Sequence, residues 1–275
     1  MTSLPASGWR RVDSTGASFV CADLLAGIPF VRHGVTLRGP ADTPFNLSFS
    51  VTDDRDTVRA NRARACALFG FEIGGLVVPA QVHGAGVAVV GAQDRSAGAL
   101  SPATAISDCD ALVTDTPGLL LGITIADCLP VFLLDTVRNA IGLAHSGWRG
   151  TAGRIAVRTL EAMAQAFGTR PEDCLAAHGP CIGPDGYEVD TRVYEAFASA
   201  DACAPGVFSP TRPGHWSLDL AAAVRHQLRT CGVPETAISL APWRTDRDTD
   251  LFFSHRLVSG CPRMGAFLGL LPAAE

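Results

Sequence analysis

Residues 119–150 read LLLGITIADCLPVFLLDTVRNAIGLAHSGWRG, and three short apolar runs make up most of this stretch. The runs at 119–126, 131–135 and 141–145 have the length of buried strands. After the third run, a helix is expected to extend to about Phe167, because apolar residues recur there at helical spacing. The stretch therefore indicates buried strands with a helix packed against them.

Further strands and helices are predicted on both sides of this stretch. A helix is expected from Asp53 to Gly70, with Asp53 or Asp54 as its N-cap. The apolar spacings at 189–197 and 220–228 mark two more helices. Additional strands are expected at 76–83, 86–90, 110–114, 174–178, 237–240, 251–254 and 264–271. Strands and helices do not alternate regularly, which favours an α/β or α+β sandwich with helices covering the sheet faces.

The composition of the 275-residue chain fits a folded protein with a large core. Hydrophobic residues make up 47% and charged residues only 18%, which is too little charge for a disordered chain. The net charge of −5 lacks the basic footprint of a nucleic-acid-binding protein. No apolar run reaches the roughly 18 residues that a membrane span needs, and residues 1–11 lack the order of a secretory signal. We expect a cytoplasmic protein without a nucleic-acid or membrane partner, and the sequence leaves its oligomeric state open.

The nine cysteines do not form a recognisable framework. An odd number without any CxxC spacing argues against a set of disulfides and against a four-cysteine zinc knot. Most are expected to be small buried apolar side chains, and only Cys128 stands out from them. The chain also lacks GxGxxG after a strand and GxxxxGK[ST], so neither a Rossmann dinucleotide site nor a phosphate loop is expected.

Three segments share one design, an apolar run that ends in a possible metal ligand beside small residues. They are AQVHG at 80–84, ADCLP at 126–130 and AHSGWRG at 144–150. The imidazoles of His83 and His145 and the thiolate of Cys128 form a catalytic type of zinc set, in which three protein ligands leave one position for water or substrate. Asp127 is a candidate for orienting a ligand or moving a proton.

Spacing alone leaves two other interpretations of these residues open. The ligands lie 45 and 17 residues apart, and no compact metal motif links them. The three side chains could be buried structural residues. Alternatively, Cys128 and His145 could form a nucleophile–base pair without a metal.

The same three segments resemble the core motifs of the YfiH-like family, which is also described as polyphenol oxidase (laccase domain), purine nucleoside phosphorylase or peptidoglycan editing factor. Flanking segments extend the resemblance over roughly residues 27–270: RHGV at 32–35, FNLS at 45–48, Asp53-Asp54 followed by Asn61-Arg62, DALVT at 110–114, GPCIGP at 179–184 and FFSHR at 252–256. The resemblance implies a single YfiH-like α/β domain at 27–272, a layered sandwich of mixed β-sheet with helices packed on the sheet faces. Residues 1–26 would be an N-terminal segment that belongs to the same domain or is partly flexible.

The resemblance also implies a zinc ion held by His83, Cys128 and His145, with copper as an adventitious substitute. The implied activity is phosphorolysis of adenosine, inosine, guanosine and methylthioadenosine, together with adenosine deamination. The expected partners are therefore a purine nucleoside and phosphate, and the expected catalytic residues are Cys128, His145 and Asp127. Some members are linked instead to removing wrongly built peptidoglycan precursors. This leaves an editing hydrolase at the same site, or a non-catalytic partner of wall-synthesis proteins, as alternatives.

Phosphorolysis requires a phosphate held near the ribose C1′ carbon, and a guanidinium group matches phosphate oxygens. Arg32, Arg149 and Arg256 lie in family-like segments, and Arg149 follows His145 at a predicted helix start, where backbone N–H groups also favour anions. Asn46 is a candidate for binding sugar hydroxyls. Each of the four also has a structural interpretation as an ion-pair, surface or turn residue.

Two activities suggested by the family's descriptions can be tested by counting motifs. A four-copper laccase needs about ten histidines, many in HxH pairs, whereas this chain has seven histidines and no HxH. The HxE and PCxxC motifs of the zinc nucleobase deaminases are also absent from the sequence. The chain departs from the family at Ser146, where Ala or Gly is usual, and at 241–245, where members often carry Cys-Thr. These departures leave the substrate preference open.

Overall fold

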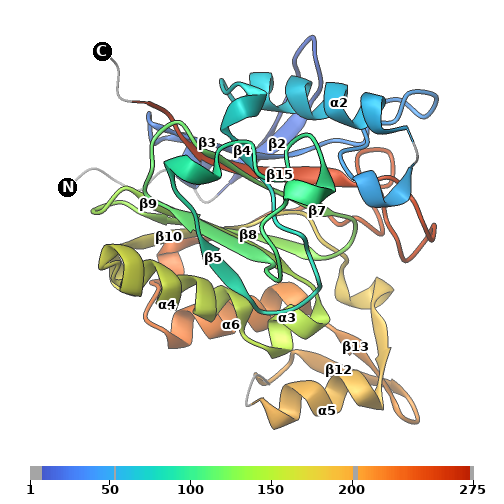
Figure 1. The fold of residues 1–275 in the computed structure, drawn as a ribbon. Coiled ribbons are helices and arrows are strands. Elements are labelled where there is room, and N and C mark those ends of the chain that lie inside the picture. Colours follow the sequence, from blue (N-terminus) through green and yellow to red (C-terminus); the bar gives the residue numbers. More distant parts are fainter. Residues whose placement is uncertain (1–7, 53, 201–203, 273–275) are drawn as a thin grey trace.

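The computed structural model describes residues 8–52, 54–200 and 204–272. Two six-stranded sheets lie face to face, and helices cover the outer face of each sheet, as Figure 1 shows. A small three-stranded sheet with its own helix lies at one end of this sandwich (Figure 1). The predicted layered α/β fold is confirmed. Within the described residues, no helix combines the length and the apolar character that a membrane crossing requires.

The first sheet includes strands from both ends of the chain. Its order is β1 (Trp9–Val12), β2 (Phe19–Ala22), β3 (Val31–Thr36), β15 (Met264–Leu270), β7 (Leu120–Ile125) and β4 (Leu76–Val77). Helix α1 (Asp23–Ala26) follows β2, and α2 (Arg55–Leu68) lies on the outer face (Figure 1). The carboxylate of Asp54 caps α2 by accepting from the backbone N–H of Thr57 at 3.0 Å. The other candidate cap, Asp53, lies outside the described residues.

The second sheet contains the strands around which the candidate site is built. Its order is β14 (Ile238–Leu240), β10 (Cys174–His178), β8 (Leu129–Asp135), β9 (Ala140–Ser146), β6 (Ala111–Thr114) and β5 (Val87–Val89). Helices α4 (Ile155–Phe167) and α6 (Leu220–Thr230) cover its outer face, and the short α3 (Trp148–Ala152) lies beside them (Figure 1). A Cβ atom on Gly142 would lie 2.7 Å from Thr159, so this glycine lets α4 approach β9 closely.

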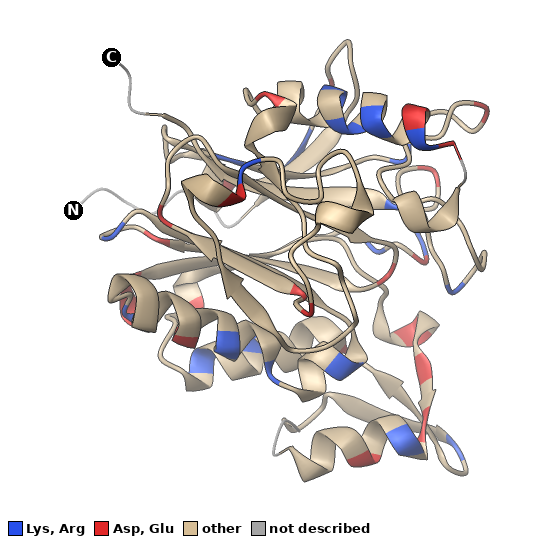
Figure 2. Ribbon diagram, viewed as in Figure 1, with Lys and Arg blue, Asp and Glu red and all other residues tan. Residues whose placement is uncertain are grey.

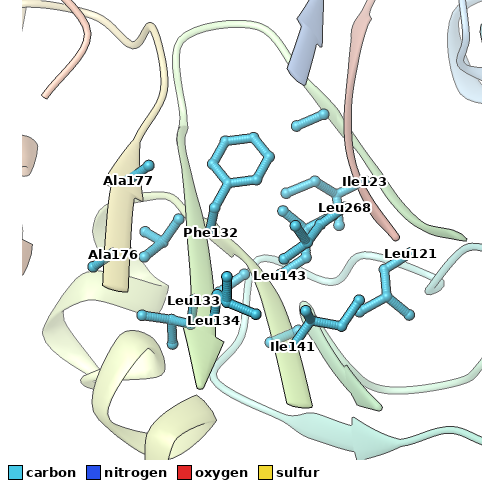
Figure 3. Close-up of a cluster of buried hydrophobic side chains, with 14 of the residues drawn as sticks. Leu121, Ile123, Phe132, Leu133, Leu134, Ile141, Leu143, Ala176, Ala177 and Leu268 are labelled. Carbon is cyan, nitrogen blue, oxygen red and sulfur yellow. The ribbon is translucent and has the colours of Figure 1, made fainter. Parts of the chain in front are cut away.

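The core lies between the two sheets. Phe132 and Leu143 are paired across β8 and β9, and they point toward Ile123 and Leu268 of the first sheet (Figure 3). Leu133, which lies between Phe132 and Leu134 on β8, points to the opposite face, which α4 and α6 cover. Since both faces of β8 are buried, its residues from Leu129 to Leu134 form a continuous apolar run rather than an alternating one, and only Asp135 at its end is charged.

A small lobe completes the fold. It consists of β11 (Glu188–Asp190), α5 (Thr191–Ser199), β12 (Phe208–Arg212) and β13 (His215–Leu218), and we call it the α5 lobe. Its own apolar cluster includes Val193, Phe197 and Leu218. Short 3-10 helices occur at Phe49–Val51, Ile73–Gly75, Ala92–Asp94, Pro102–Thr104, Pro171–Asp173, Pro184–Gly186 and Glu235–Ala237.

Two predicted strands are wrong or too long. The expected strand at 76–83 is limited to β4, because Pro79 has no N–H to donate to a ladder and His83 has a left-handed backbone with φ 58°. The expected strand at 251–254 is a loop whose Phe252 and Phe253 are buried. An apolar run indicates burial, and a buried loop produces the same signal as a strand.

Two helix predictions also need correction. The helix predicted after residue 150 is two helices, because Arg154 has a left-handed backbone (φ 58°) that separates α3 from α4. Val189 was expected in a helix but lies in β11, and α5 begins only after Asp190, whose side chain caps it. The strands β1 to β3 and the sheet of the α5 lobe were not predicted.

Candidate metal centre

The three predicted ligands converge in space. One side-chain nitrogen each of His83 and His145 and the Sγ atom of Cys128 all lie within 4.8 Å of one another. The two imidazole rings meet edge to face, with centroids 4.9 Å apart. Within the described residues, this is the one group of three or more His, Cys, Asp or Glu side chains close enough to share a metal ion.

Strand register explains how these distant residues meet. Cys128 lies in the connection between β7 and β8, and Leu129 pairs with Ser146, so Cys128 lies beside the end of β9, which carries His145. Gly147 follows directly, and a Cβ atom there would lie 2.9 Å from the Cys128 sulfur. The glycine therefore leaves room for the thiolate at the point where β9 turns into α3.

The buried carboxylate of Asp110 connects two of the ligands. Its Oδ1 atom lies 2.7 Å from Nδ1 of His145 and accepts from the backbone N–H of His83 at 3.0 Å. Its Oδ2 atom accepts from the backbone N–H groups of Val82 and Gly84 at 3.0 and 2.8 Å. With Nδ1 of His145 engaged by Asp110, the Nε2 atom is the one available to a metal.

The electrostatics of the cluster favour an ionised thiol. Burial acts to raise the pKa of Cys128, but the charge of His145 and hydrogen bonds with His145 and His83 outweigh it and lower the pKa to about 6. Burial acts to lower the pKa of His145, but Cys128 and Asp110 outweigh it and raise the pKa to about 9. The metal-free site therefore holds a thiolate, the form of cysteine that ligates metals.

Asp127 adjoins Cys128, but its carboxylate is engaged in other contacts. Oδ1 accepts from the Thr245 hydroxyl at 2.6 Å and Oδ2 accepts from the backbone N–H of Arg256 at 2.7 Å. Both bonds join segments more than a hundred residues away in the chain. In this structure Asp127 holds the 245 and 256 segments against the site.

The ligands open onto a cavity of about 380 Å³, which we call the metal-side cavity. The cavity is also lined by three basic side chains, those of His255, Arg256 and Arg263, and the guanidinium of Arg256 lies over the ring of Tyr187, 5.0 Å from the ring centroid. Gln81 forms part of the rim and is fixed by Thr124, from whose N–H and hydroxyl it accepts hydrogen bonds at 2.8 and 3.0 Å. The cluster of possible metal ligands thus lies in the same cavity as several groups suited to anions.

The predicted substrate-binding residues fall in different places. Arg256 lines the metal-side cavity, and Arg149 lines a second cavity that adjoins it. Arg32 lies on β3, away from both, and donates to the carbonyl groups of Pro29 and Val31. Asn46 is buried and accepts from the backbone N–H of Arg263 at 3.0 Å, so it supports the wall without lining the cavity.

Sequence reasoning did not identify Asp110 or Arg263 as site residues. Asp110 carried a weak signal, a carboxylate directly before a buried strand in a chain with few charges. Arg263 similarly directly precedes β15. The sequence did not show that both residues face the ligands, because that depends on which strands are neighbours.

Comparisons with known proteins agree with this fold. The family model described as multi-copper polyphenol oxidoreductase laccase matches residues 28–271. The purine nucleoside phosphorylase YlmD of Geobacillus stearothermophilus is 37% identical over 266 residues, which cover 96% of this chain and 95% of that protein. A protein named adenosine deaminase RL5, from an unknown prokaryotic organism, is 34% identical over 240 residues, which cover 85% and 91%. The crystal structure of the Bacillus licheniformis hypothetical protein YfiH matches with a TM-score of 0.88 at 29% identity, covering 94% of this chain and 98% of that chain.

Proposed function

This chain belongs to the YfiH-like family, the one described as multi-copper polyphenol oxidoreductase laccase, and from that membership and its site we propose that it is a zinc-dependent purine nucleoside phosphorylase. The proposed substrates are adenosine, inosine, guanosine and methylthioadenosine. Deamination of adenosine is proposed as a second activity of the same site. The relatives named purine nucleoside phosphorylase and adenosine deaminase support both activities.

The observation that carries the proposal is the placement of the His83, Cys128 and His145 donors in a cavity that His255, Arg256 and Arg263 also line. Two imidazoles and a thiolate suit zinc, and three protein donors would leave one coordination position for water or substrate. When bound, the ion would supply Lewis-acid stabilisation of negative charge on a reacting group. Asp110 fixes the direction of the His145 ring and the backbone position of His83.

The chain's own residues would orient the second substrate, phosphate. In phosphorolysis a phosphate oxygen forms a bond to C1′ while the C1′–N9 bond breaks, and the purine leaves with the electron pair and takes up a proton. Arg256 uses one nitrogen to donate to the carbonyl of Glu188 at 3.1 Å, which leaves its other N–H groups for phosphate oxygens. Arg263 is held by Cys261 and lies 3.4 Å from Nδ1 of His255. We propose that these cations bind phosphate in the cavity that the metal ligands line.

The donor set also bears on the laccase name in the family's description. The described residues contain one group of three potential ligands, whereas a multicopper oxidase must hold four copper ions. Copper could replace zinc at the His83, Cys128 and His145 donors, since such donors bind it tightly. We therefore propose a single-metal enzyme and treat copper as a substitute for zinc.

The experiment is metal analysis combined with a two-product assay. Protein purified without added metal is analysed for zinc and copper by mass spectrometry, and then incubated with adenosine with and without phosphate. We expect about one zinc per chain, adenine release only with phosphate, and slower ammonia release that needs no phosphate. Cys128→Ala should abolish both activities, whereas Cys231→Ala, at a half-buried cysteine away from the cavity, should retain them.

Two results would overturn the proposal in different ways. Protein that contains zinc but converts none of the four nucleosides would point to the editing hydrolase, for which peptidoglycan precursors are the next substrates. Full activity in a metal-free preparation would show that Cys128 and His145 act as a pair without an ion.

A further inference from the structure

A second cavity, of about 480 Å³, adjoins the metal-side cavity, and the two share Tyr187 and Arg256 as lining residues. We call it the arginine cavity, because Arg149, Arg192 and Arg212 line it together with Arg256. It lies between α3 and the α5 lobe, and Figure 2 shows basic residues on helices α3 and α5. Four arginines therefore gather around one cavity in a chain whose net charge is −5.

The acidic residues that line the cavity neutralise Arg212 but not Arg149, Arg192 or Arg256. Glu188 is paired with Arg212 at 2.8 Å and also accepts from the Thr211 hydroxyl. Asp190 uses its carboxylate to cap α5, by accepting from the backbone N–H of Val193. In the part of the chain that the structure describes, no carboxylate lies within ion-pair distance of Arg149, Arg192 or Arg256. Three guanidinium groups therefore face the cavity without an ionic partner.

Two of these cations share one aromatic ring. The guanidinium carbon of Arg149 lies 4.3 Å from the centroid of Trp148, and that of Arg192 lies 5.7 Å from the same ring. Each contact is favourable alone, but together they hold two like charges near each other. The indole thus orders both guanidinium groups at the lining of the arginine cavity, where an anion would relieve their repulsion. This arrangement is organised for an anion before any ligand arrives.

We propose that the arginine cavity binds the phosphate of a nucleotide substrate, so that the substrate class extends from purine nucleosides to adenosine 5′-phosphates. The inference rests on the proposed function, which places the purine and ribose in the metal-side cavity. A phosphate that attacks C1′ must lie beside the reacting atoms, whereas the arginine cavity begins on the far side of Tyr187 and Arg256. Arg149, Arg192 and Arg212, which line the arginine cavity but not the metal-side cavity, would therefore contact a part of the substrate remote from the reaction, where binding energy can still support catalysis. Guanidinium groups suit a phosphate ester as well as free phosphate.

The test measures binding separately from turnover. Zinc-loaded protein is titrated by calorimetry with adenosine, AMP, ADP and orthophosphate at one ionic strength. We expect AMP or ADP to bind about tenfold more tightly than adenosine, as charge-assisted bonds to two arginines would allow. Arg192→Ala should lower the ratio of nucleotide affinity to adenosine affinity about fivefold or more, and Arg192→Lys should retain part of it. Arg55→Ala, at an exposed arginine on α2, should leave the ratio unchanged.

The outcomes distinguish this inference from the proposed function. Nucleotides that bind no more tightly than adenosine, or a ratio that Arg192→Ala does not change, would overturn the nucleotide site. Orthophosphate affinity that falls with Arg192→Ala, without any nucleotide advantage, would also overturn it and would make the cavity a site for free phosphate. Tight, Arg192-dependent nucleotide binding without turnover of any nucleoside would support the site and contradict the proposed phosphorylase activity.

Discussion

Asp110 and His145 are joined by a 2.7 Å contact between Oδ1 of the carboxylate and Nδ1 of the imidazole, and both side chains are buried. The same oxygen accepts the backbone N–H of His83 at 3.0 Å. One carboxylate therefore sets the ring direction of one predicted ligand and the backbone position of another. Burial acts to raise the pKa of Asp110, but the hydrogen bonds from His145 and Gly84 outweigh it, so the pKa is lowered and the carboxylate remains ionised.

Replacing this carboxylate by an amide should weaken metal binding. In Asp110→Asn the single remaining acceptor oxygen cannot serve four donors, and the amide NH₂ group would face a backbone N–H. We expect zinc affinity to fall about 10- to 100-fold, as is typical of outer-shell partners of metal-bound histidines. The measurement is a competition titration with a zinc-binding dye. Asp115→Asn, at an exposed residue, is the control, and equal affinity in both variants would contradict the role of Asp110.

The metal should contribute measurably to stability through Cys128. Zinc that binds the folded state alone raises the free energy of unfolding by about 2.7 kcal/mol at a hundredfold excess over Kd. We therefore expect added zinc to raise the melting temperature of the metal-free protein, and a chelator to reverse the increase. Cys128→Ser should show no such increase. A zinc-induced shift that survives in Cys128→Ser would mean that the ion binds elsewhere.

Gly147→Ala tests whether the space beside the thiolate is needed. The added Cβ atom would lie 2.9 Å from the Cys128 sulfur, so the sulfur or the start of α3 must move. We expect zinc affinity to fall about tenfold, comparable with the loss of an outer-shell contact. A Cβ atom on Gly74 would have no atom within 4 Å, so Gly74→Ala is the matched control. Unchanged zinc affinity in Gly147→Ala would show that the site adapts without loss.

The variant Asp127→Asn distinguishes a positioning role of Asp127 from a role in proton transfer. The carboxylate accepts one bond from Thr245 and one from the backbone of Arg256, and an asparagine can accept well only through one oxygen. A positioning role predicts that KM for phosphate rises severalfold while kcat changes little, because the Arg256 segment is displaced. The measurement is the phosphate dependence of adenine release. A large fall in kcat with an unchanged KM would indicate instead that Asp127 moves a proton.

Two buried histidines should make the fold sensitive to acid. Burial lowers the pKa of His33 and of His178 to about 3, and neither nitrogen of His178 has a hydrogen-bond partner in the structure. The folded state keeps both rings neutral, whereas the unfolded chain protonates them below about pH 6.5. Their contribution to stability is therefore present above that pH and is lost as the pH falls toward 3.

The expected slope can be measured by urea unfolding between pH 7.5 and 4.5. Each histidine should lower the free energy of unfolding by about 1.4 kcal/mol for each pH unit below about 6. His178→Leu should remove one such contribution, whereas His226→Leu, at an exposed residue, should not. A pH dependence that is the same in both variants would contradict the assignment to His178.

Much of the fold could be predicted because apolar runs report burial directly. The strands β6 to β10 and the helix α6 follow runs or spacings that are visible in the chain. The strands β1 to β3 were missed because their runs are short and include charged residues such as Arg11, Asp23 and Arg32 in or beside them. The loop at 251–254 was taken for a strand because burial does not specify backbone pairing.

By itself, the sequence determined which residues lie at the ends of the central apolar runs. It thereby identified the His83, Cys128 and His145 donors, because those donors lie within local motifs. Only the tertiary structure decided their surroundings. The β8–β9 register brings Cys128 beside the end of β9 and His145, and the chain path brings Asp110 to two of the ligands while it leaves Arg32 outside the site. The arginine cavity likewise exists only because the α5 lobe packs against α3. Contacts between residues distant in the chain depend on strand order and register, which no local pattern contains.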